Sequence, residues 1–400
     1  MSSEWLRGTL GEYIELSNGK TRPEEGGRTS VYGSNGIIGS CQESNSPKET
    51  IVIGRVGTYC GSLHFSKEEC WVTDNAIKAV AKKGGHSRYF FDLLKTCDLG
   101  RLRAGSGQPL LNQSILGSIE IDIPPIEEQK AIAHILGTLD DKIELNRKTN
   151  ETLEAMAKAL FKSWFVDFDP VRAKAEGRLT GLPAEISNLF PDSFEDSELG
   201  EIPSGWRVDS IYSVASVTYG APFSSSLFNG EGNGTPVARI RDLPGESPGV
   251  FTTEVHPKGI LIAPGDIVVG MDGEFRAYLW GGEECWMNQR VCKFIPGIKG
   301  RTCFLRESIR KPLMDVEMSE TATTVIHLGK GDIDGFRVVV PVQEILDTFS
   351  AATTPLYEEV VANKQQTRVL ANIRDALLPK LISGEIRIPD AEKMLEEVGV

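Results

Sequence analysis

Two kinds of hydrophobic pattern alternate along the chain. Short apolar runs, bounded by clusters of Gly, Asn, Ser and Pro, fill residues 1–124 and 206–341. Such runs are typical of β-strands separated by turns. Two longer segments, 126–165 and 342–382, carry apolar residues alternately three and four positions apart, as long helices do. The pattern therefore predicts two β-rich modules, each followed by a long helix.

The two halves of the chain also match each other in order. The matching positions are Trp5/Trp206, Leu10/Ile211, Gly19/Gly220, 51–57/267–273, 69–71/284–286, Lys78/Lys293 and 121–124/338–341. The offset between partners is close to half the chain and drifts slowly along it, as a duplication with small loop insertions produces. We therefore expect one structural unit to be present twice.

The first helical segment carries a heptad seam for more than four heptads. Its seam residues are Ile132, Leu136, Leu139, Ile143, Asn146, Asn150, Leu153, Ala157, Leu160 and Trp164. Applying the offset of the 121–124/338–341 match gives the second seam: Phe349, Thr353, Leu356, Val360, Asn363, Thr367, Leu370, Arg374, Leu377 and Leu381. Asn146 and Asn363 coincide, and a polar residue in such a seam typically fixes the register of a helix pair. Arg374 is out of place there.

Helices of this length span roughly 60 Å, enough to bury their seams against each other. Because the chain order is module, helix, module, helix, we expect the helices to run antiparallel. The modules would then be related by a pseudo-twofold axis. The predicted fold class is α+β, with two β-rich domains separated by two long antiparallel coiled-coil helices.

The same patterns divide the chain into segments. They are module 1 (1–125), the first long helix (126–165), a linker (166–205), module 2 (206–341), the second long helix (342–382) and a C-terminal tail (383–400). The linker is rich in Pro and Gly, and we expect it to be an irregular connection.

The net charge of −13 argues by itself against a nucleic-acid partner. The modules are nevertheless near neutral, with 14 Lys/Arg against 14 Asp/Glu in 1–124 and 14 against 16 in 206–341. The acidic excess lies in 186–205, with five acids and no base, and in 342–400, with ten acids against six bases. Basic patches on the modules therefore stay compatible with the composition.

The sequence contains no run of about 18 uncharged apolar residues and begins without an apolar signal region. We therefore expect a cytoplasmic protein with no membrane contact. Seven cysteines, an odd number without any Cys-x-x-Cys spacing, indicate reduced thiols rather than a disulfide framework or a zinc site.

Motifs that carry chemistry are missing. There is no phosphate-binding loop, no Gly-x-Gly-x-x-Gly after a strand, and no methyltransferase motif, since 123–126 (Ile-Pro-Pro-Ile) lacks the Asn or Asp and the aromatic residue. The Glu-Gln-Lys at 128–130 opens a helix, where acids are favoured by the backbone dipole. The five histidines are scattered without metal-binding spacing. A duplicated architecture without an active site indicates recognition rather than catalysis.

Three segments carry a resemblance to a known family. Residues 161–174 (FKSWFVDFDPVRAK) closely resemble the central region of type I restriction-modification specificity subunits, and 377–386 (LLPKLISGEI) resemble their C-terminal region. Residues 124–129 (PPIEEQ) look like their entry into the first spacer helix. The resemblance covers essentially the whole chain. One departure is 343–346 (QEIL), which lacks the second Glu-Gln pair at the start of the second helix.

The resemblance implies two target-recognition domains, each reading one half of a bipartite double-stranded DNA site, with the paired helices acting as a ruler between them. It implies assembly with two methylation subunits and, for cleavage, two restriction subunits. S-adenosylmethionine, ATP and magnesium would be bound by those partners. This chain would then have no catalytic, cofactor-binding or metal-binding residues and would not be an enzyme.

Base contacts are expected from Arg or Lys on guanine and from Asn or Gln on adenine, presented by turns and glycine-flanked loops. The candidates in module 1 are Lys20, Arg22, Asn35, Arg55, Tyr59, Arg103 and Gln108. The candidates in module 2 are Arg239, Arg241, Arg276, Tyr278, Gln289 and Arg290. A phosphate contact or a solvated surface charge is the alternative interpretation of each one.

Two other classes of function stay open at this stage. A self-sufficient modification or restriction enzyme would need a cofactor or metal of its own, and the missing motifs argue against it. A scaffold or anti-restriction DNA mimic would bind the methylation subunit without reading DNA, and the overall acidity permits this. Two homologous but diverged modules favour two different readouts instead.

Overall fold

The computed structural model describes residues 5–102, 110–319 and 326–397. The chain forms two compact units, Met1–Glu144 with Val369–Val400 (unit 1) and Leu145–Arg368 (unit 2). Each unit contains one β-rich module and a stretch of both long helices, so the predicted α+β class is confirmed. Among the described residues, no helix is long and apolar enough to cross a membrane.

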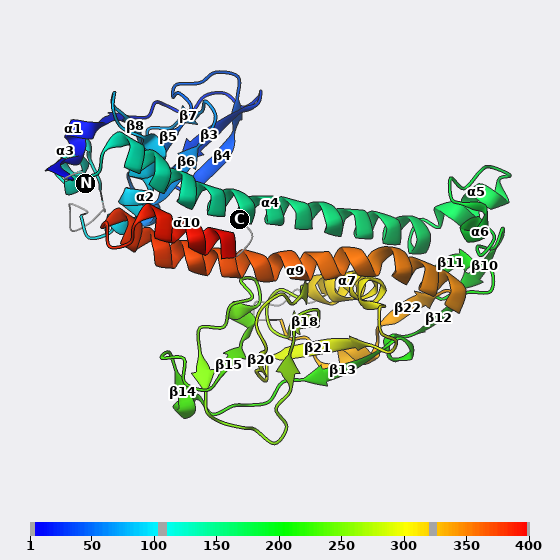
Figure 1. The fold of residues 1–400 in the computed structure, drawn as a ribbon. Coiled ribbons are helices and arrows are strands. Elements are labelled where there is room, and N and C mark those ends of the chain that lie inside the picture. The colour runs from blue at the N-terminus through cyan, green and yellow to red at the C-terminus, as the bar shows by residue number, and fades with distance from the viewer. Residues whose placement is uncertain (1–4, 103–109, 320–325, 398–400) are drawn as a thin grey trace. The chain divides into compact units, whose positions relative to one another are not determined.

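The main sheet of unit 1 has the antiparallel order β2-β8-β5-β6. Figure 1 labels β8, β5 and β6 of this sheet. Its strands are β2 (Ile14–Asn18), β8 (Ala76–Ala81), β5 (Thr50–Gly54) and β6 (Leu63–Ser66). All five residues of β5 are buried, because the strand is covered on both faces. Ile51 and Ile53 face the core shared with helix α2 (Ser87–Thr96), and Val52 faces a second cluster with Tyr32.

Smaller elements complete unit 1. A second sheet has the order β4-β3-β7, with β3 (Thr29–Gly33), β4 (Gly36–Cys41) and β7 (Trp71–Val72), and a two-stranded ladder joins β1 (Leu6–Thr9) to β9 (Glu120–Ile123). The short helices are α1 (Leu10–Tyr13), η1 (Gly57–Tyr59) and α3 (Gln113–Gly117). Strands β3 and β7 are parallel, and the other pairs are antiparallel.

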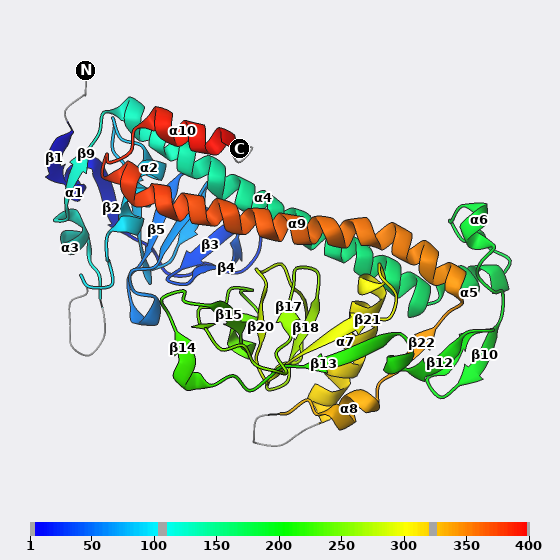
Figure 2. The same ribbon diagram turned by 60° about the horizontal axis from the view of Figure 1, so that its bottom comes forward.

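Unit 2 repeats this plan (Figure 2). Its main sheet has the order β13-β21-β18-β19, with β13 (Ala215–Tyr219), β21 (Val291–Pro296), β18 (Ile267–Gly270) and β19 (Ala277–Leu279). Its second sheet has the order β14-β16-β15-β20-β17, with β14 (Phe228–Asn229), β16 (Phe251–Thr252), β15 (Thr235–Ala238), β20 (Cys285–Met287) and β17 (Leu261–Ile262). The remaining elements are β12 (Arg207–Ser210) paired with β22 (Arg337–Val340), α7 (Thr302–Ser319), α8 (Lys330–Asp334), η2 (Ile211–Ser213), η3 (Ser225–Leu227) and η4 (Ile240–Asp242).

The structure confirms the internal repeat strand by strand. The matched sequence segments fall on β5 and β18, on β7 and β20, on β8 and β21, and on β9 and β22. Gly19 and Gly220 show why glycine recurs. A Cβ at either position would lie well inside 3.0 Å of a backbone carbonyl oxygen, that of Thr73 or of Asn288. Glycine is therefore required directly after β2, which passes the turn that follows β7, and directly after β13, which passes the turn that follows β20.

Two 40-residue helices, α4 (Ile126–Phe165) and α9 (Gln343–Ile382), carry the predicted seams. Within unit 1, the early α4 residues Ile132 and Leu136 share a core with the late α9 residues Leu377 and Leu381. Within unit 2, late α4 meets early α9, and the rings of Trp164 and Phe349 lie 5.9 Å apart. The pairing is therefore antiparallel in both units, as predicted.

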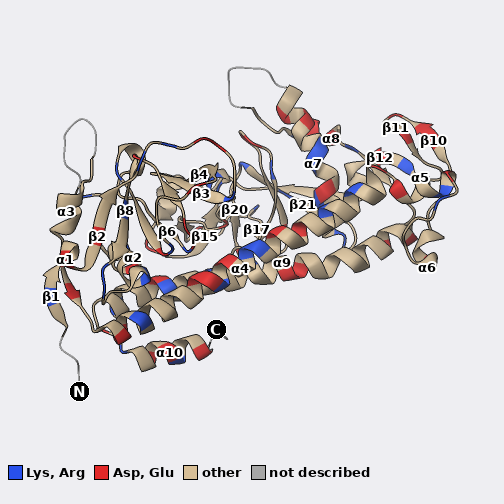
Figure 3. Ribbon diagram, turned by 90° about the horizontal axis from the view of Figure 1, so that it is seen from above, with Lys and Arg blue, Asp and Glu red and all other residues tan. Residues whose placement is uncertain are grey.

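The linker 166–205 is more ordered than we expected. It contains α5 (Asp169–Ala175), α6 (Ala184–Ser187) and a hairpin of β10 (Phe194–Ser197) with β11 (Gly200–Pro203). Phe168 and Phe190 pack around the ring of Trp206 within 6.4 Å, and this aromatic cluster stabilises the connection. The hairpin is acidic (Figure 3). The C-terminal tail forms α10 (Ile388–Glu397), whose Ala391 and Leu395 are buried in the core of unit 1.

Candidate nucleic-acid interface

Three loops of module 1 converge at one end of its sheets. They are the β3–β4 turn (33–36), the segment after β5 (54–57) and the β7–β8 turn (73–75). The backbone N–H of Arg55 donates to the carbonyl of Asn75 (3.0 Å), and the hydroxyl of Ser34 donates to the same oxygen. The hydroxyl of Ser62 in turn donates to the carbonyl of Ser34. We call these three segments the module 1 loops.

Module 2 brings the equivalent segments together, and we call them the module 2 loops: 238–242, 270–273 and 287–290. The N–H of Met271 donates to the carbonyl of Arg290 (2.9 Å), and the N–H of Asn288 donates to that of Ala238 (3.1 Å). The repeat aligns Met271 with Arg55 and Arg290 with Asn75, so the first of these bonds is the counterpart of the Arg55–Asn75 bond. Both modules therefore hold their loops together with equivalent backbone hydrogen bonds. We call the hydrogen-bonded loops of each module its loop frame.

A further segment of each module forms a β-bridge with its loop frame. Val56 forms an isolated antiparallel bridge with Leu110, and Asp272 forms one with His327. These two bridges are again related by the repeat, which aligns Val56 with Asp272 and Leu110 with His327. The candidates Arg103 and Gln108 precede Leu110 and lie outside the described residues.

Four of the module 1 candidates belong to this frame or border it. Asn35 is exposed at the β3–β4 turn, Tyr59 is 50% exposed in η1, and Lys20 is exposed where it bridges Thr73. Arg55 is half-buried, and its Nε has no hydrogen-bond partner among the described residues. A buried guanidinium nitrogen without a partner suits a site that a polar ligand completes.

In module 2, Arg241, Gln289 and Arg290 are exposed on the loops. The Nε of Arg290 lies 3.6 Å from Asp272, and Asp272 is also 2.5 Å from Nδ1 of His327. Arg239 is held differently: its Nε and Nη2 donate to both carboxylate oxygens of Asp242 (2.9 and 3.2 Å). This bidentate pair orients the loop and leaves Arg241 as the neighbouring arginine that projects from it.

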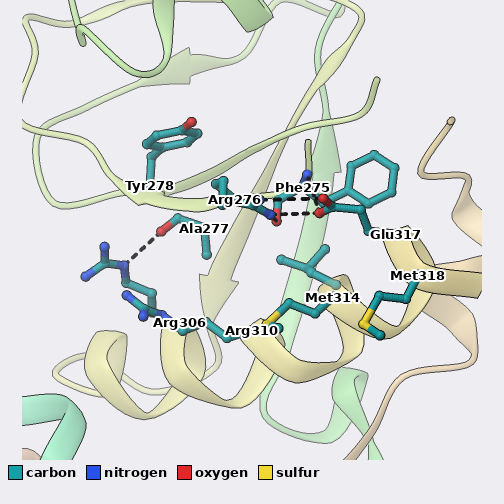
Figure 4. A pocket seen from close by; sticks show the side chains of 10 residues that line it. Phe275, Arg276, Ala277, Tyr278, Arg306, Arg310, Met314, Glu317 and Met318 are labelled. Atoms are coloured by element: carbon teal, nitrogen blue, oxygen red, sulfur yellow. Dashed lines mark hydrogen bonds and ion pairs between the residues drawn. The ribbon is translucent and has the colours of Figure 1, made fainter. Parts of the chain in front are cut away.

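Three candidates lie outside the loops and contact other parts of their modules. Arg22 is paired with Glu25 (2.5 Å) and also donates to the carbonyl of Ile38 on β4. Arg276 and Tyr278 line a groove of about 450 Å³ between β19 and α7, where Nη1 of Arg276 donates to Glu317 (2.7 Å; Figure 4). Burial raises the pKa of the Tyr278 hydroxyl.

Sequence reasoning missed other polar residues of the two frames. Ser34, Ser62 and Asn75 in module 1 and Asp272, Asn288 and His327 in module 2 were not among the candidates. One available signal was the repeat itself, because it aligns the candidates Gln289 and Arg290 with Asp74 and Asn75. Among the described residues, no group of three or more His, Cys, Asp or Glu side chains is arranged to hold a metal ion.

Comparison with known proteins identifies a family that this chain matches. Residues 2–155 match the family described as "Type I restriction modification DNA specificity domain". The specificity subunit of the type I restriction enzyme MjaIX from Methanocaldococcus jannaschii is 27% identical over 406 residues, which cover 95% of this chain and 85% of the relative. The chain belongs to the family of type I restriction-modification specificity subunits.

Other specificity subunits agree with this assignment. That of the enzyme HindI from Haemophilus influenzae is 27% identical over 70% of this chain and 71% of its own. The crystal structure of a type I restriction-modification S subunit from M. genitalium has a TM-score of 0.58 and 16% identity, over 94% of this chain and 96% of that one. The family resemblance in the sequence is thus confirmed, and the chain is a DNA specificity subunit of a non-catalytic family.

Proposed function

We propose that each module reads one half of an asymmetric, bipartite DNA site in the major groove and that α4 and α9 set the gap between the halves. The observation that carries this proposal is the loop frame built twice from equivalent backbone hydrogen bonds, with different side chains on each copy. One scaffold that presents two unlike sets of polar side chains suits two unlike short sequences.

Readers joined by rigid helices can contact half-sites about one helical turn, roughly 34 Å, apart on one face of DNA. Bases in between are then spanned without being read. The side chains that we assign to reading belong to the loops or border them, and all except the half-buried Arg55 are exposed. They are Lys20, Asn35, Arg55 and Tyr59 in module 1 and Arg241, Gln289 and Arg290 in module 2.

The proposal includes the partners of the complex. Double-stranded DNA is bound by the modules, two methylation subunits dock on the helices, and two restriction subunits join for cleavage. S-adenosylmethionine, ATP and magnesium are bound by those subunits and not by this chain. The relatives support this part, since each is named as the specificity subunit of a restriction enzyme.

The test is selection from a randomised DNA library, with the chain co-purified with its methylation subunit. We expect two short, unlike motifs at one fixed gap. Arg290→Ala should then change the motif read by module 2 and leave the other intact. Arg276→Ala is the matched control, because that arginine is also exposed but is paired with Glu317 beside α7, and it should change neither motif.

An assembled complex that selects no motif would refute the proposal. In that case the acidic chain would function as a scaffold or anti-restriction DNA mimic for the methylation subunit.

A further inference from the structure

A cluster of charged side chains joins module 1 to both long helices within unit 1. Asp140 on α4 accepts hydrogen bonds from Arg88 of α2 and from Nη1 of Arg374 on α9 (2.8 Å). Nε of Arg88 also donates to Asp92 of its own helix (2.8 Å), and Lys95 pairs with Asp92 (2.9 Å). One carboxylate on α4 therefore connects a module helix with the opposite long helix.

This cluster is largely withdrawn from water. The side chains of Arg88 and Asp92 are 10% and 1% exposed, and the guanidinium of Arg88 also lies 5.4 Å from the ring centre of Phe91. A buried charge is tolerated only when an opposite charge and well-aligned hydrogen bonds offset the loss of its hydration. Burial by itself would raise the pKa of Asp140, but the hydrogen bond from Arg374 and the charges of Lys95 and Arg88 outweigh it and lower that pKa. The polar residue Arg374 in the seam thus has a structural partner.

Unit 2 contains a corresponding cluster around Arg306 of α7, whose side chain is 8% exposed. Its Nη1 donates to Glu154 on α4 (2.8 Å) and to the hydroxyl of Tyr357 on α9 (3.3 Å). Its Nε donates to the carbonyl of Ala277 on β19 (2.9 Å; Figure 4). A single guanidinium therefore contacts the sheet of module 2 and both long helices.

The two clusters occupy equivalent places in the repeat. Asp92 and Lys95 of α2 align with Glu307 and Arg310 of α7. The second two also form an ion pair three residues apart, with 3.1 Å between Nε of Arg310 and the carboxylate of Glu307. Asp140 on α4 aligns with Tyr357 on α9, whose hydroxyl donates to Glu307 (3.2 Å). In each unit, therefore, the equivalent position of a long helix, Asp140 or Tyr357, bonds to the module helix, although the two side chains differ.

We propose that these two clusters fix the angle at which each module is held on the long helices, and thereby limit the gap length that the protein accepts. Resting on the proposed function, this assigns Arg88 and Arg306 as positioning residues that contact no DNA.

The clusters can fix this angle because hydrogen bonds are directional. Apolar packing between a module and a helix is non-directional, so it tolerates small tilts. A guanidinium that donates along several fixed directions to three separate elements does not. Successive base pairs are about 3.4 Å apart, so a small tilt carried out to the reading loops is enough to bring them opposite a neighbouring base pair.

The experiment compares Arg306→Met with the wild-type chain, each co-purified with the methylation subunit. The measured quantity is the ratio of affinities for the selected gap and for gaps one base pair longer or shorter. We expect Arg306→Met to lower this ratio by about threefold or more while both half-site motifs stay unchanged. Lys311→Met is the matched control on the same helix, because Lys311 forms an exposed pair with Asp315 of that helix.

Tyr357→Phe provides a milder test, since it removes only the hydroxyl between Arg306 and Glu307 and keeps the ring. It should lower the ratio in the same direction, and so should Asp140→Asn in the other cluster. A lower melting temperature with an unchanged ratio in these variants would overturn the inference, because the clusters would then contribute only stability. A wild-type complex without any fixed gap would instead refute the proposed function itself.

Discussion

An asparagine layer lies between α4 and α9 within unit 2. Nδ2 of Asn363 donates to Oδ1 of Asn150 (3.0 Å), and Nδ2 of Asn150 donates to the carbonyl of Val360 (3.1 Å). Asn146 donates to Oε1 of Gln366 (2.8 Å). All three asparagines are buried. Each amide therefore depends on the opposite helix for its partner, and the layer can be tested by removing one or both members of a pair.

The perturbation is the pair of single changes Asn150→Leu and Asn363→Leu together with the double change. Asn150→Leu leaves the buried amide of Asn363 without its acceptor, and Asn363→Leu leaves the buried Oδ1 of Asn150 without its donor. An unsatisfied buried polar group costs about 1–3 kcal/mol. The added apolar burial offsets part of this, so each single variant should be destabilised by about 1 kcal/mol. The double change removes both amides and most of the penalty, and it should be near neutral or stabilising. The expected coupling energy between the two positions is therefore about 2 kcal/mol or more.

The assay is thermal unfolding of the full chain. For a unit of this size, about 1 kcal/mol moves the melting temperature by about 2–4 °C, so each single variant should melt that much below the wild-type protein. The double variant should melt at or above the wild-type temperature. A double variant that falls by the sum of the two single effects would refute this reasoning, since the two amides would then act independently. If the layer also fixes register, as the sequence predicts for Asn146 and Asn363, the double variant should accept a wider range of gap lengths.

Two further predictions concern stability. Gly220→Ala should destabilise the chain by about 2 kcal/mol or more, because its Cβ would overlap the carbonyl of Asn288. Gly137→Ala, in α4 with nothing within 4 Å of the new Cβ, should stabilise it by about 0.5–1 kcal/mol, and melting effects of equal sign would contradict the reasoning. The pKa of Asp140 is lowered below its ordinary value of 3.8, so its ionised form adds stability that is present above that pH and lost as the pH falls further. The melting-temperature difference between wild type and Asp140→Asn should therefore shrink below about pH 4, and a constant difference down to pH 3 would contradict this.

The repeat and the paired helices could be predicted because their signals are local and periodic. The heptad spacing indicates a buried seam whatever the partner is, and runs such as 51–53 indicate a strand covered on both faces. The linker could not be predicted in the same way. Its helices and hairpin are stabilised by Phe168 and Phe190 packing on Trp206, a contact between residues distant in sequence and without any period.

Individual site residues were less accessible to sequence reasoning. Arg22 and Arg239 were chosen as arginines in turns, yet each pairs with an acid three positions later, Glu25 or Asp242. That spacing was visible in the sequence and could have indicated an internal partner. The loop frame itself depends on hydrogen bonds between segments that are well separated along the chain, such as Arg55 with Asn75, and no local pattern reveals them.

The loop frames have a consequence for how a new target can be acquired. Their connecting bonds run largely between backbone atoms, as from Arg55 to Asn75 and from Met271 to Arg290. Exposed side chains such as Gln289 contribute nothing to those bonds, so they can be replaced without dismantling the frame. On the proposed function, retargeting of one half-site is thus separated from folding and from the other half-site. A small set of interchangeable modules could then generate many combined specificities, whose number grows as the product of the choices at the two positions.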